Sequence, residues 1–136
     1  MSDLPKSMAN EDGEPDMLAL YVRSEYHRTD LSLRTLREAN TERNTHWDPK
    51  GKLTLSFRGC ELGGEVGELL NVIKKLERET LGLRGSRDTV EHLAEELADV
   101  IICADLIGMA TGIDLAQAVR DKFNATSLKL NLPVTL

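Results

Sequence analysis

The stretch that decides the fold spans residues 59–79 and reads GCELGGEVGELLNVIKKLERE, and its counterpart at residues 90–111 reads VEHLAEELADVIICADLIGMAT. Apolar residues recur every three or four positions in both, which is the period of a helix with one apolar face. The first stretch also holds four glycines, each costing a helix about 1 kcal/mol relative to alanine. It stacks Glu61, Glu65 and Glu68 along one side of the same helix. Because both features are unfavourable for a helix, we expect them to serve a function other than packing.

The apolar residues of the two stretches form one stripe on each helix. The stripes consist of Leu62, Val66, Leu69, Ile73 and Leu76 in the first, and of Leu93, Leu97, Val100, Ala104 and Ile107 in the second. Because only a short loop, residues 82–88, joins the stretches, the two helices are expected to pair antiparallel with their stripes facing each other.

The flanking segments extend this helical pattern. Residues 31–47 predict a further helix that ends at the turn DPKG, residues 48–51. Asp88 is the expected N-cap of the second long helix, and Gly112 is the expected glycine at its C-terminal end. Asp114 is expected to cap a last helix that closes the chain's regular structure.

The domain organisation follows from these segments. Residues 1–16 are polar and acidic and predict a flexible tail, whereas helical periodicity begins at Met17. β-branched residues nowhere alternate with polar ones for long, so strands are not expected. Residues 17–136 therefore predict one all-α domain, an antiparallel bundle of four to five helices.

Composition and charge narrow the functional class. The chain has 136 residues and a formal net charge of -6, which disfavours nonspecific binding to a nucleic-acid polymer or to an anionic membrane surface. A small polyanion could still bind if a cation mediates the contact. The N-terminus lacks the basic start and apolar stretch of a signal peptide. Two cysteines, Cys60 and Cys103, lie in helical patterns and are expected to be reduced, as in the cytoplasm.

Four acidic residues are expected to meet between the two long helices. Glu65 and Glu68 lie beside one stripe, and Glu96 and Asp99 lie beside the other. Two carboxylates about 5 Å apart repel by roughly 3 kcal/mol at an effective dielectric constant near 20. The cluster therefore requires a divalent cation, protonated carboxyl groups, or wider separation than the pattern predicts. Oxygen ligands of this kind favour Mg²⁺, with Mn²⁺ as a substitute.

The glycines suggest a surface that allows close approach. Gly59, Gly63 and Gly67 recur at steps of four and share one face of the helix, beside the acidic line. A face without side chains would let a partner helix or a bulky triphosphate approach the backbone there.

The order and spacing of these acids carry a family resemblance. E65-V-G-E68 is followed after 27 residues by E96-L-A-D99, which resembles the ExxE…ExxD signature of the MazG-like all-α nucleoside triphosphate pyrophosphatases. The segments ELGGEVGELLNVIKK, LAEELADVIICADLIGMATGIDL and AVRDKFNATSLKLNLP are similar too, so the resemblance covers about residues 40–133. It implies a helical bundle that assembles as a homodimer or homotetramer. The implied reaction is Mg²⁺-dependent cleavage between the α and β phosphates, releasing a monophosphate and pyrophosphate.

The resemblance also implies roles for individual residues. The implied metal ligands are Glu65, Glu68, Glu96 and Asp99, and the implied substrate-binding residues are Arg43, Trp47, Lys122 and Asn124. Trp47 and Arg43 match the family's arrangement only in part, because their mutual spacing differs. Many members have a glutamate where Gly64 stands, and Glu61 is the candidate to supply this additional acidic group here.

The chemistry of the reaction adds catalytic candidates. Glu61 or Glu65 is the candidate group that orients the attacking water. Lys75 and Lys122 are the candidates that offset negative charge on the phosphates.

Three alternatives remain open from the sequence. The same helices would suit a catalytically silent dimerisation or adaptor module, or a pyrophosphohydrolase for another nucleotide such as phosphoribosyl-ATP. Trp47 suits a core or interface anchor as well as a base-stacking platform.

His92 is expected to be a helix-surface residue, and Cys103 a small buried side chain.

Overall fold

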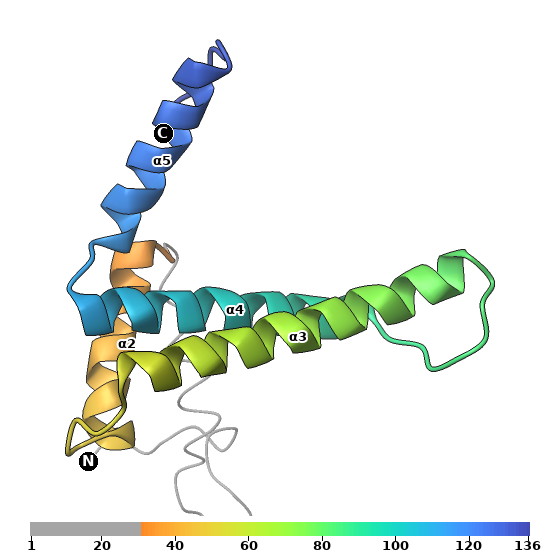
Figure 1. Ribbon diagram of the computed structural model, residues 1–136, viewed down its shortest axis with the longest axis horizontal. Coiled ribbons are helices and arrows are strands. Elements are labelled where there is room, and N and C mark those ends of the chain that lie inside the picture. The colour runs from red at the N-terminus through yellow and green to blue at the C-terminus, as the bar shows by residue number, and fades with distance from the viewer. Residues whose placement is uncertain (1–30) are drawn as a thin grey trace, which may run out of the picture. The chain divides into compact units, whose positions relative to one another are not determined.

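Helices make up the regular structure of the part of the chain that the computed structural model describes, residues 31–136 (Figure 1). They are α2 (Leu33–Trp47), α3 (Leu55–Thr80), α4 (Val90–Thr111) and α5 (Leu115–Lys129). No strand occurs in residues 31–136, so the predicted all-α class is confirmed there. The predicted tail, residues 1–16, and the helical pattern from Met17 lie outside the described residues.

The two long helices α3 and α4 run side by side in opposite directions, as expected (Figure 1). α3 begins after Thr54, whose hydroxyl accepts a hydrogen bond from the backbone N–H of Phe57. α4 ends at Gly112, whose φ of 69° lies in the left-handed region that favours glycine. Local sequence signals therefore set the length of the pair.

The start of α4 differs from the sequence prediction by one residue. Its N-cap is Thr89, whose hydroxyl accepts from the backbone N–H of His92. The prediction that Asp88 caps this helix is wrong, because its carboxylate pairs with Lys75 and His92 instead. The prediction for Asp114 is confirmed, since its carboxylate accepts from the backbone N–H of Gln117 and caps α5.

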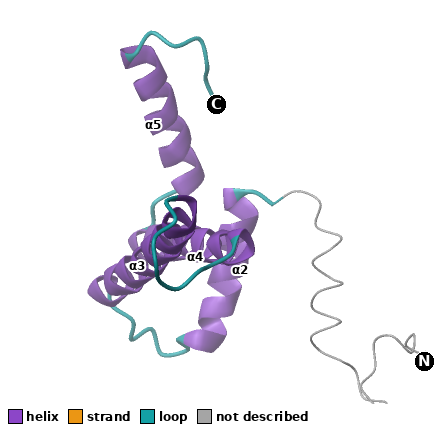
Figure 2. Ribbon diagram, turned by 90° about the vertical axis from the view of Figure 1, so that its right-hand side faces the viewer, coloured by secondary structure: helices purple, strands orange, loops and turns teal. Residues whose placement is uncertain are grey.

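α2 crosses α4 through a buried polar contact, and Figure 2 shows the two helices next to each other. Asp105 of α4 is fully buried and accepts from Arg37 Nε at 3.0 Å and from Asn40 Nδ2 at 2.9 Å. Gly108 makes room for this contact, because a Cβ there would lie 2.5 Å from Arg37 Nη2. The crossing is held by a neutralised, hydrogen-bonded carboxylate.

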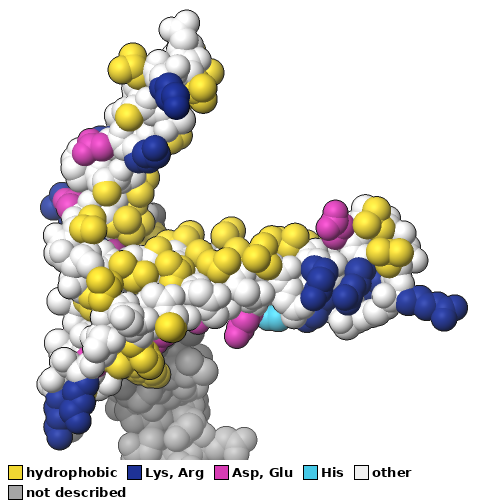
Figure 3. All heavy atoms as spheres, in the orientation of Figure 1, with side chains coloured by type: hydrophobic (Ala, Val, Ile, Leu, Met, Phe, Trp, Pro, Cys, Tyr) yellow, Lys and Arg dark blue, Asp and Glu magenta, His cyan; other side chains and the backbone are white. Residues whose placement is uncertain are grey.

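The apolar stripes are only partly buried between α3 and α4. Among the described residues, Val72 and Cys103 are the only buried hydrophobic residues, and burial of Cys103 agrees with the sequence expectation. Val66, Ile73 and Leu97, which were expected in the seam, are exposed. Both helices are rotated so that an acidic residue occupies the seam in place of part of each stripe. Figure 3 shows the resulting band of apolar side chains along one edge of the pair.

α5 follows Gly112 and contacts α2. Its apolar side chains include Val119 and Phe123, which are 42% and 41% exposed, and Figure 3 shows apolar groups along it. Within residues 31–136, no helix combines the length and apolar character that crossing a membrane requires.

Candidate metal centre and adjoining pocket

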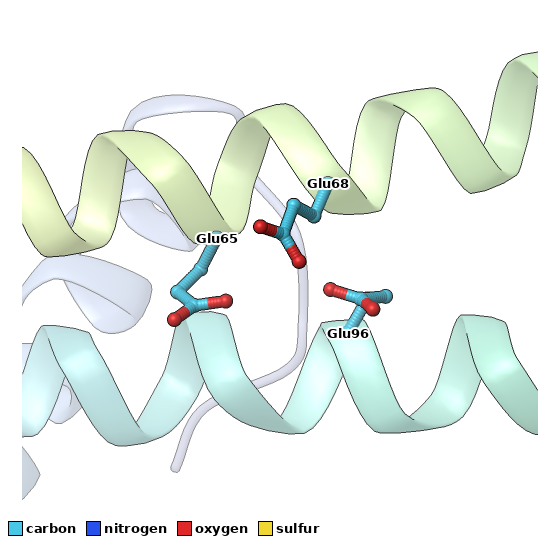
Figure 4. A group of neighbouring side chains, drawn as sticks. All are labelled: Glu65, Glu68 and Glu96. Atoms are coloured by element: carbon cyan, nitrogen blue, oxygen red, sulfur yellow. The ribbon is translucent and has the colours of Figure 1, made fainter.

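Three glutamates meet halfway along the α3–α4 pair (Figure 4). Glu65 and Glu68 project from α3 toward Glu96 on α4, and one oxygen from each lies within 4.8 Å of the others. Their position follows from helix geometry, since the two α3 residues are three apart and share a face. Three of the four predicted metal ligands are therefore brought together.

Glu96 is the most constrained member of this acidic cluster. The residue is 7% exposed, and its Oε1 lies 2.8 Å from Nε2 of His92. Its Oε2 is buried and has no hydrogen-bond partner. A buried carboxylate oxygen without a partner is costly, and this one belongs to a carboxylate that clusters with those of Glu65 and Glu68. A cation is the group that such an arrangement best accommodates.

The fourth predicted ligand, Asp99, lies close to the cluster but outside the group of three. Burial raises the pKa of Glu65, and the neighbouring charge of Asp99 is the next cause, followed by Glu68 and Glu96. A raised carboxyl pKa means that the ionised form is disfavoured in the folded chain. A bound divalent cation would reverse this preference, because it stabilises the ionised carboxylates.

A chain of polar contacts extends from Glu96 to α3. The Nδ1 of His92 lies 2.6 Å from Asp88 Oδ1, and Asp88 Oδ2 accepts from Lys75 Nζ at 2.8 Å. The hydrogen bond from Lys75, followed by that from His92, holds the pKa of Asp88 well below its usual range. In turn, Asp88 raises the pKa of His92 despite partial burial. Lys75 is thus engaged in an ion pair, whereas the sequence suggested a phosphate contact.

A pocket of about 220 Å³ adjoins the cluster where α2, α3 and α4 meet. Its wall includes Asn44 and Trp47 from α2, Arg58 and Glu61 from α3, and Asp99 from α4. Asp99 and Glu61 also act on the pKa of Glu65. The acidic cluster and the pocket are therefore adjacent parts of one site.

Arg58 organises the wall of this pocket from a buried position. It is 4% exposed and donates from Nη1 to Glu61 Oε2 at 3.0 Å and from Nη2 to Asn44 Oδ1 at 2.6 Å. Glu61 is consequently held in place, and the amide nitrogen of Asn44 is left to face other partners. The sequence analysis missed Arg58, although its position three residues before Glu61 was a usable signal.

Trp47 and Arg43, which the resemblance implies as substrate-binding residues, both line the same pocket. Trp47 is 74% exposed, so it is not a core residue of the described part of the chain. Arg43 donates from Nη2 to Asn40 Oδ1 at 2.9 Å, which ties it to the buried contact beneath α2.

Lys122 and Asn124 lie on α5 and belong neither to the cluster nor to the lining of this pocket. Asn124 instead pairs with the C-terminal residue, accepting from the backbone N–H of Leu136 and donating to its carbonyl. Lys122 lines a shallow apolar groove along α5. Within one chain, these two predicted substrate contacts are not assembled with the others.

The glycines of α3 leave open space on its surface. A Cβ added at Gly59, Gly63, Gly64 or Gly67 would meet no atom within 4 Å. The expected face without side chains is present, and the described part of the chain does not fill it.

Comparisons of the chain with protein-family models, with curated proteins and with solved structures gave no match. The geometry of the cluster and its pocket is therefore the basis for assigning a function.

Proposed function

We propose that the protein is a Mg²⁺-dependent nucleotide pyrophosphohydrolase that cleaves a nucleoside triphosphate between its α and β phosphates. One observation carries the proposal. Buried Glu96, one of whose oxygens has no hydrogen-bond partner, clusters with Glu65 and Glu68 beside a pocket of about 220 Å³. This arrangement offers oxygen ligands for a hard cation next to a place for an organic group.

The cation would be held by Glu65, Glu68 and Glu96, with Asp99 as a further ligand from α4. Mg²⁺, or Mn²⁺ in its place, would supply charge neutralisation of phosphate oxygens and acidification of a bound water. The ligand set contains only carboxylates, which suits these hard cations better than softer metals. The negatively charged chain needs such an ion to accept a polyphosphate at all.

Two carboxylates of the site are candidates to orient the attacking water. Glu61 is fixed by Arg58, so its remaining oxygen has a defined direction. Glu65 belongs to the acidic cluster itself, so it would lie beside a water bound to the proposed cation. Either group would accept a proton from water at the edge between cluster and pocket.

The pocket would hold the nucleoside end of the substrate. Its volume of about 220 Å³ is below the roughly 300–1,000 Å³ of pockets for whole drug-sized ligands, and suits one ring system. The exposed indole of Trp47 would stack on the base, and the amide of Asn44 and the guanidinium of Arg43 would supply polar contacts. With the base here, the phosphates would extend toward the acidic cluster.

We further propose that the active form is a cytoplasmic homodimer or homotetramer. Burial of only two apolar side chains in the described residues leaves a single chain with little apolar core. A second copy covering the exposed band on α3 and α4 would add that core. It could also bring Lys122 and Asn124 of its own α5 to the site of its neighbour.

The experiment that tests this function is a screen for pyrophosphate release from the natural ribo- and deoxyribonucleoside triphosphates and phosphoribosyl-ATP, with Mg²⁺ or with EDTA. We expect Mg²⁺-dependent release of pyrophosphate and a monophosphate from at least one of them. Glu96→Gln should abolish it while the protein remains folded. Glu95→Gln, the matched control, changes an exposed neighbour and should retain activity.

A catalytically silent dimerisation module is the second candidate, and the exposed apolar band favours it. It predicts no Mg²⁺-dependent product from any nucleotide in the screen. It also predicts that Glu65→Gln leaves dimerisation unchanged.

A further inference from the structure

We infer that His92 is a positioning residue that aims one oxygen of Glu96 at the cation, and that Asp88 and Lys75 hold His92 in place for this task. The inference rests on the proposed function only in assuming that the acidic cluster binds a divalent cation. It assigns a role to three side chains outside the predicted ligand set.

The inference depends on the difference between the two oxygens of Glu96, of which one is hydrogen-bonded and the other is not. Oε1 lies 2.8 Å from His92 Nε2, whereas Oε2 is buried without a partner. An ionised carboxylate only accepts hydrogen bonds, so Nε2 is the donor. The carboxylate is thus held at one oxygen, while its other oxygen has no partner, in a residue that clusters with Glu65 and Glu68.

The second ring nitrogen fixes the orientation of the imidazole. His92 Nδ1 lies 2.6 Å from Asp88 Oδ1, so the ring is held from both sides and cannot rotate without losing a contact. Asp88 is itself 8% exposed at its side chain and bound by Lys75 at 2.8 Å. Since Lys75 comes from α3, the relay also links the two helices that supply the acidic cluster.

Hydrogen-bonded partners of metal ligands commonly set ligand orientation, and their removal typically weakens metal binding about 10- to 100-fold. The spacing fits this role, because His92 and Glu96 are four residues apart on α4 and share its face. A histidine placed only for solubility would have no reason to engage two carboxylates at once.

The test measures Mn²⁺ binding to the full-length protein by the electron paramagnetic resonance signal of free Mn²⁺, without substrate. His92→Ala should raise the Kd about 10- to 100-fold. His92→Gln keeps an N–H donor within reach of Glu96 and should restore most of the affinity. Asp88→Asn weakens the contact with Nδ1 of the ring, and its Kd should lie between those of His92→Gln and His92→Ala. His46→Ala changes a histidine at the end of α2 and should leave the Kd unchanged.

The outcomes separate this inference from the proposed function. If His92→Ala is folded and binds Mn²⁺ as wild type does, or if His92→Gln is as weak as His92→Ala, the positioning role is overturned. If His92→Ala does not fold, the Kd values of the other proteins decide. The Kd is expected to rise from wild type to His92→Gln to Asp88→Asn, and a different order overturns the positioning role. Wild type that binds no Mn²⁺ overturns both ideas. If Mn²⁺ binding depends on His92 as expected but the wild type releases no pyrophosphate, the proposed function alone is overturned.

Discussion

α4 buries a carboxylate at two places, and the two are treated in opposite ways. Asp105, where α2 crosses, is 0% exposed and receives hydrogen bonds from Arg37 and Asn40. Glu96, where α3 passes, is 7% exposed, keeps one oxygen unpartnered and faces two further carboxylates. The first contact is complete within the chain, whereas the second leaves one carboxylate oxygen unpartnered, for which the proposed cation would be the partner.

This contrast separates a stabilising polar contact from a candidate binding site. A buried charge with matched donors holds two elements together, and removing one partner strands the others. A buried charge among like charges lowers stability until a ligand arrives, and such unfavourable arrangements concentrate at functional sites. The predictions below test whether the two places on α4 respond in opposite directions.

The largest effect is expected at the complete contact. Asp105→Ala leaves the guanidinium of Arg37 and the amide of Asn40 without their acceptor, and should cost about 3–5 kcal/mol of unfolding free energy. Urea denaturation in EDTA measures it. Asp121→Asn, on the exposed face of α5, is the control and should cost less than about 0.5 kcal/mol. A loss below about 1 kcal/mol at Asp105 would show that the crossing is held by something else.

A cation should stabilise the incomplete contact. Mn²⁺ at about 100 times its Kd should raise the unfolding free energy of wild type by about 2.7 kcal/mol. Glu96→Gln should show little of this gain, because it removes the charge of the unpartnered oxygen. Denaturation with Mn²⁺ and with EDTA provides the comparison, and equal gains in both proteins would contradict the assignment.

Removing one charge from the cluster should be neutral or stabilising without metal. Glu68→Gln relieves repulsion with Glu65 and Glu96, and should raise the unfolding free energy in EDTA by about 0–1 kcal/mol after solvent screening. The same denaturation experiment measures it. A clear loss of stability would mean that the three carboxylates are already compensated, and the contrast with Asp105 would disappear.

The glycine face should show a gain of similar or smaller size. Gly67→Ala places a methyl group where nothing lies within 4 Å and should add about 0.5–1 kcal/mol, because alanine is the better helix former. If a substrate or a second copy approaches this face, pyrophosphate release or self-association should fall despite the added stability. Gly82→Ala offers the opposite control, since its φ of 65° penalises any side chain.

The smallest effect concerns Asp88, whose lowered pKa makes its contribution depend on pH. A group with a depressed folded-state pKa stabilises above its unfolded-state value and loses this contribution as pH falls through the folded one. The urea midpoint of wild type should therefore exceed that of Asp88→Asn at about pH 5, and the difference should shrink as pH is lowered below about 4. Midpoints measured in EDTA at several pH values check this. A difference that grows on acidification would contradict the ion pairs with Lys75 and His92.

Much of the site was predictable because its parts repeat within single helices. Glu65 and Glu68 share a face of α3 whatever surrounds them, and a short loop forces α4 to lie alongside. Trp47 and Arg43 were expected at the substrate site, and both line the pocket. The contacts of Lys75 and His92 were not anticipated, because both residues pair with Asp88, which the capping pattern assigned elsewhere.

Local patterns in the sequence predicted the four helices, their approximate ends and the acidic groups on both long helices, since periodicity and caps are local properties. Only the tertiary structure decided the rotation of α4 about its axis, which buries Glu96 and exposes Leu97. It also joined Asn40 to Asp105 across 65 positions. The physical reason is that pairing a buried charge depends on which distant side chains the packing brings within hydrogen-bond range, and no local pattern encodes that distance.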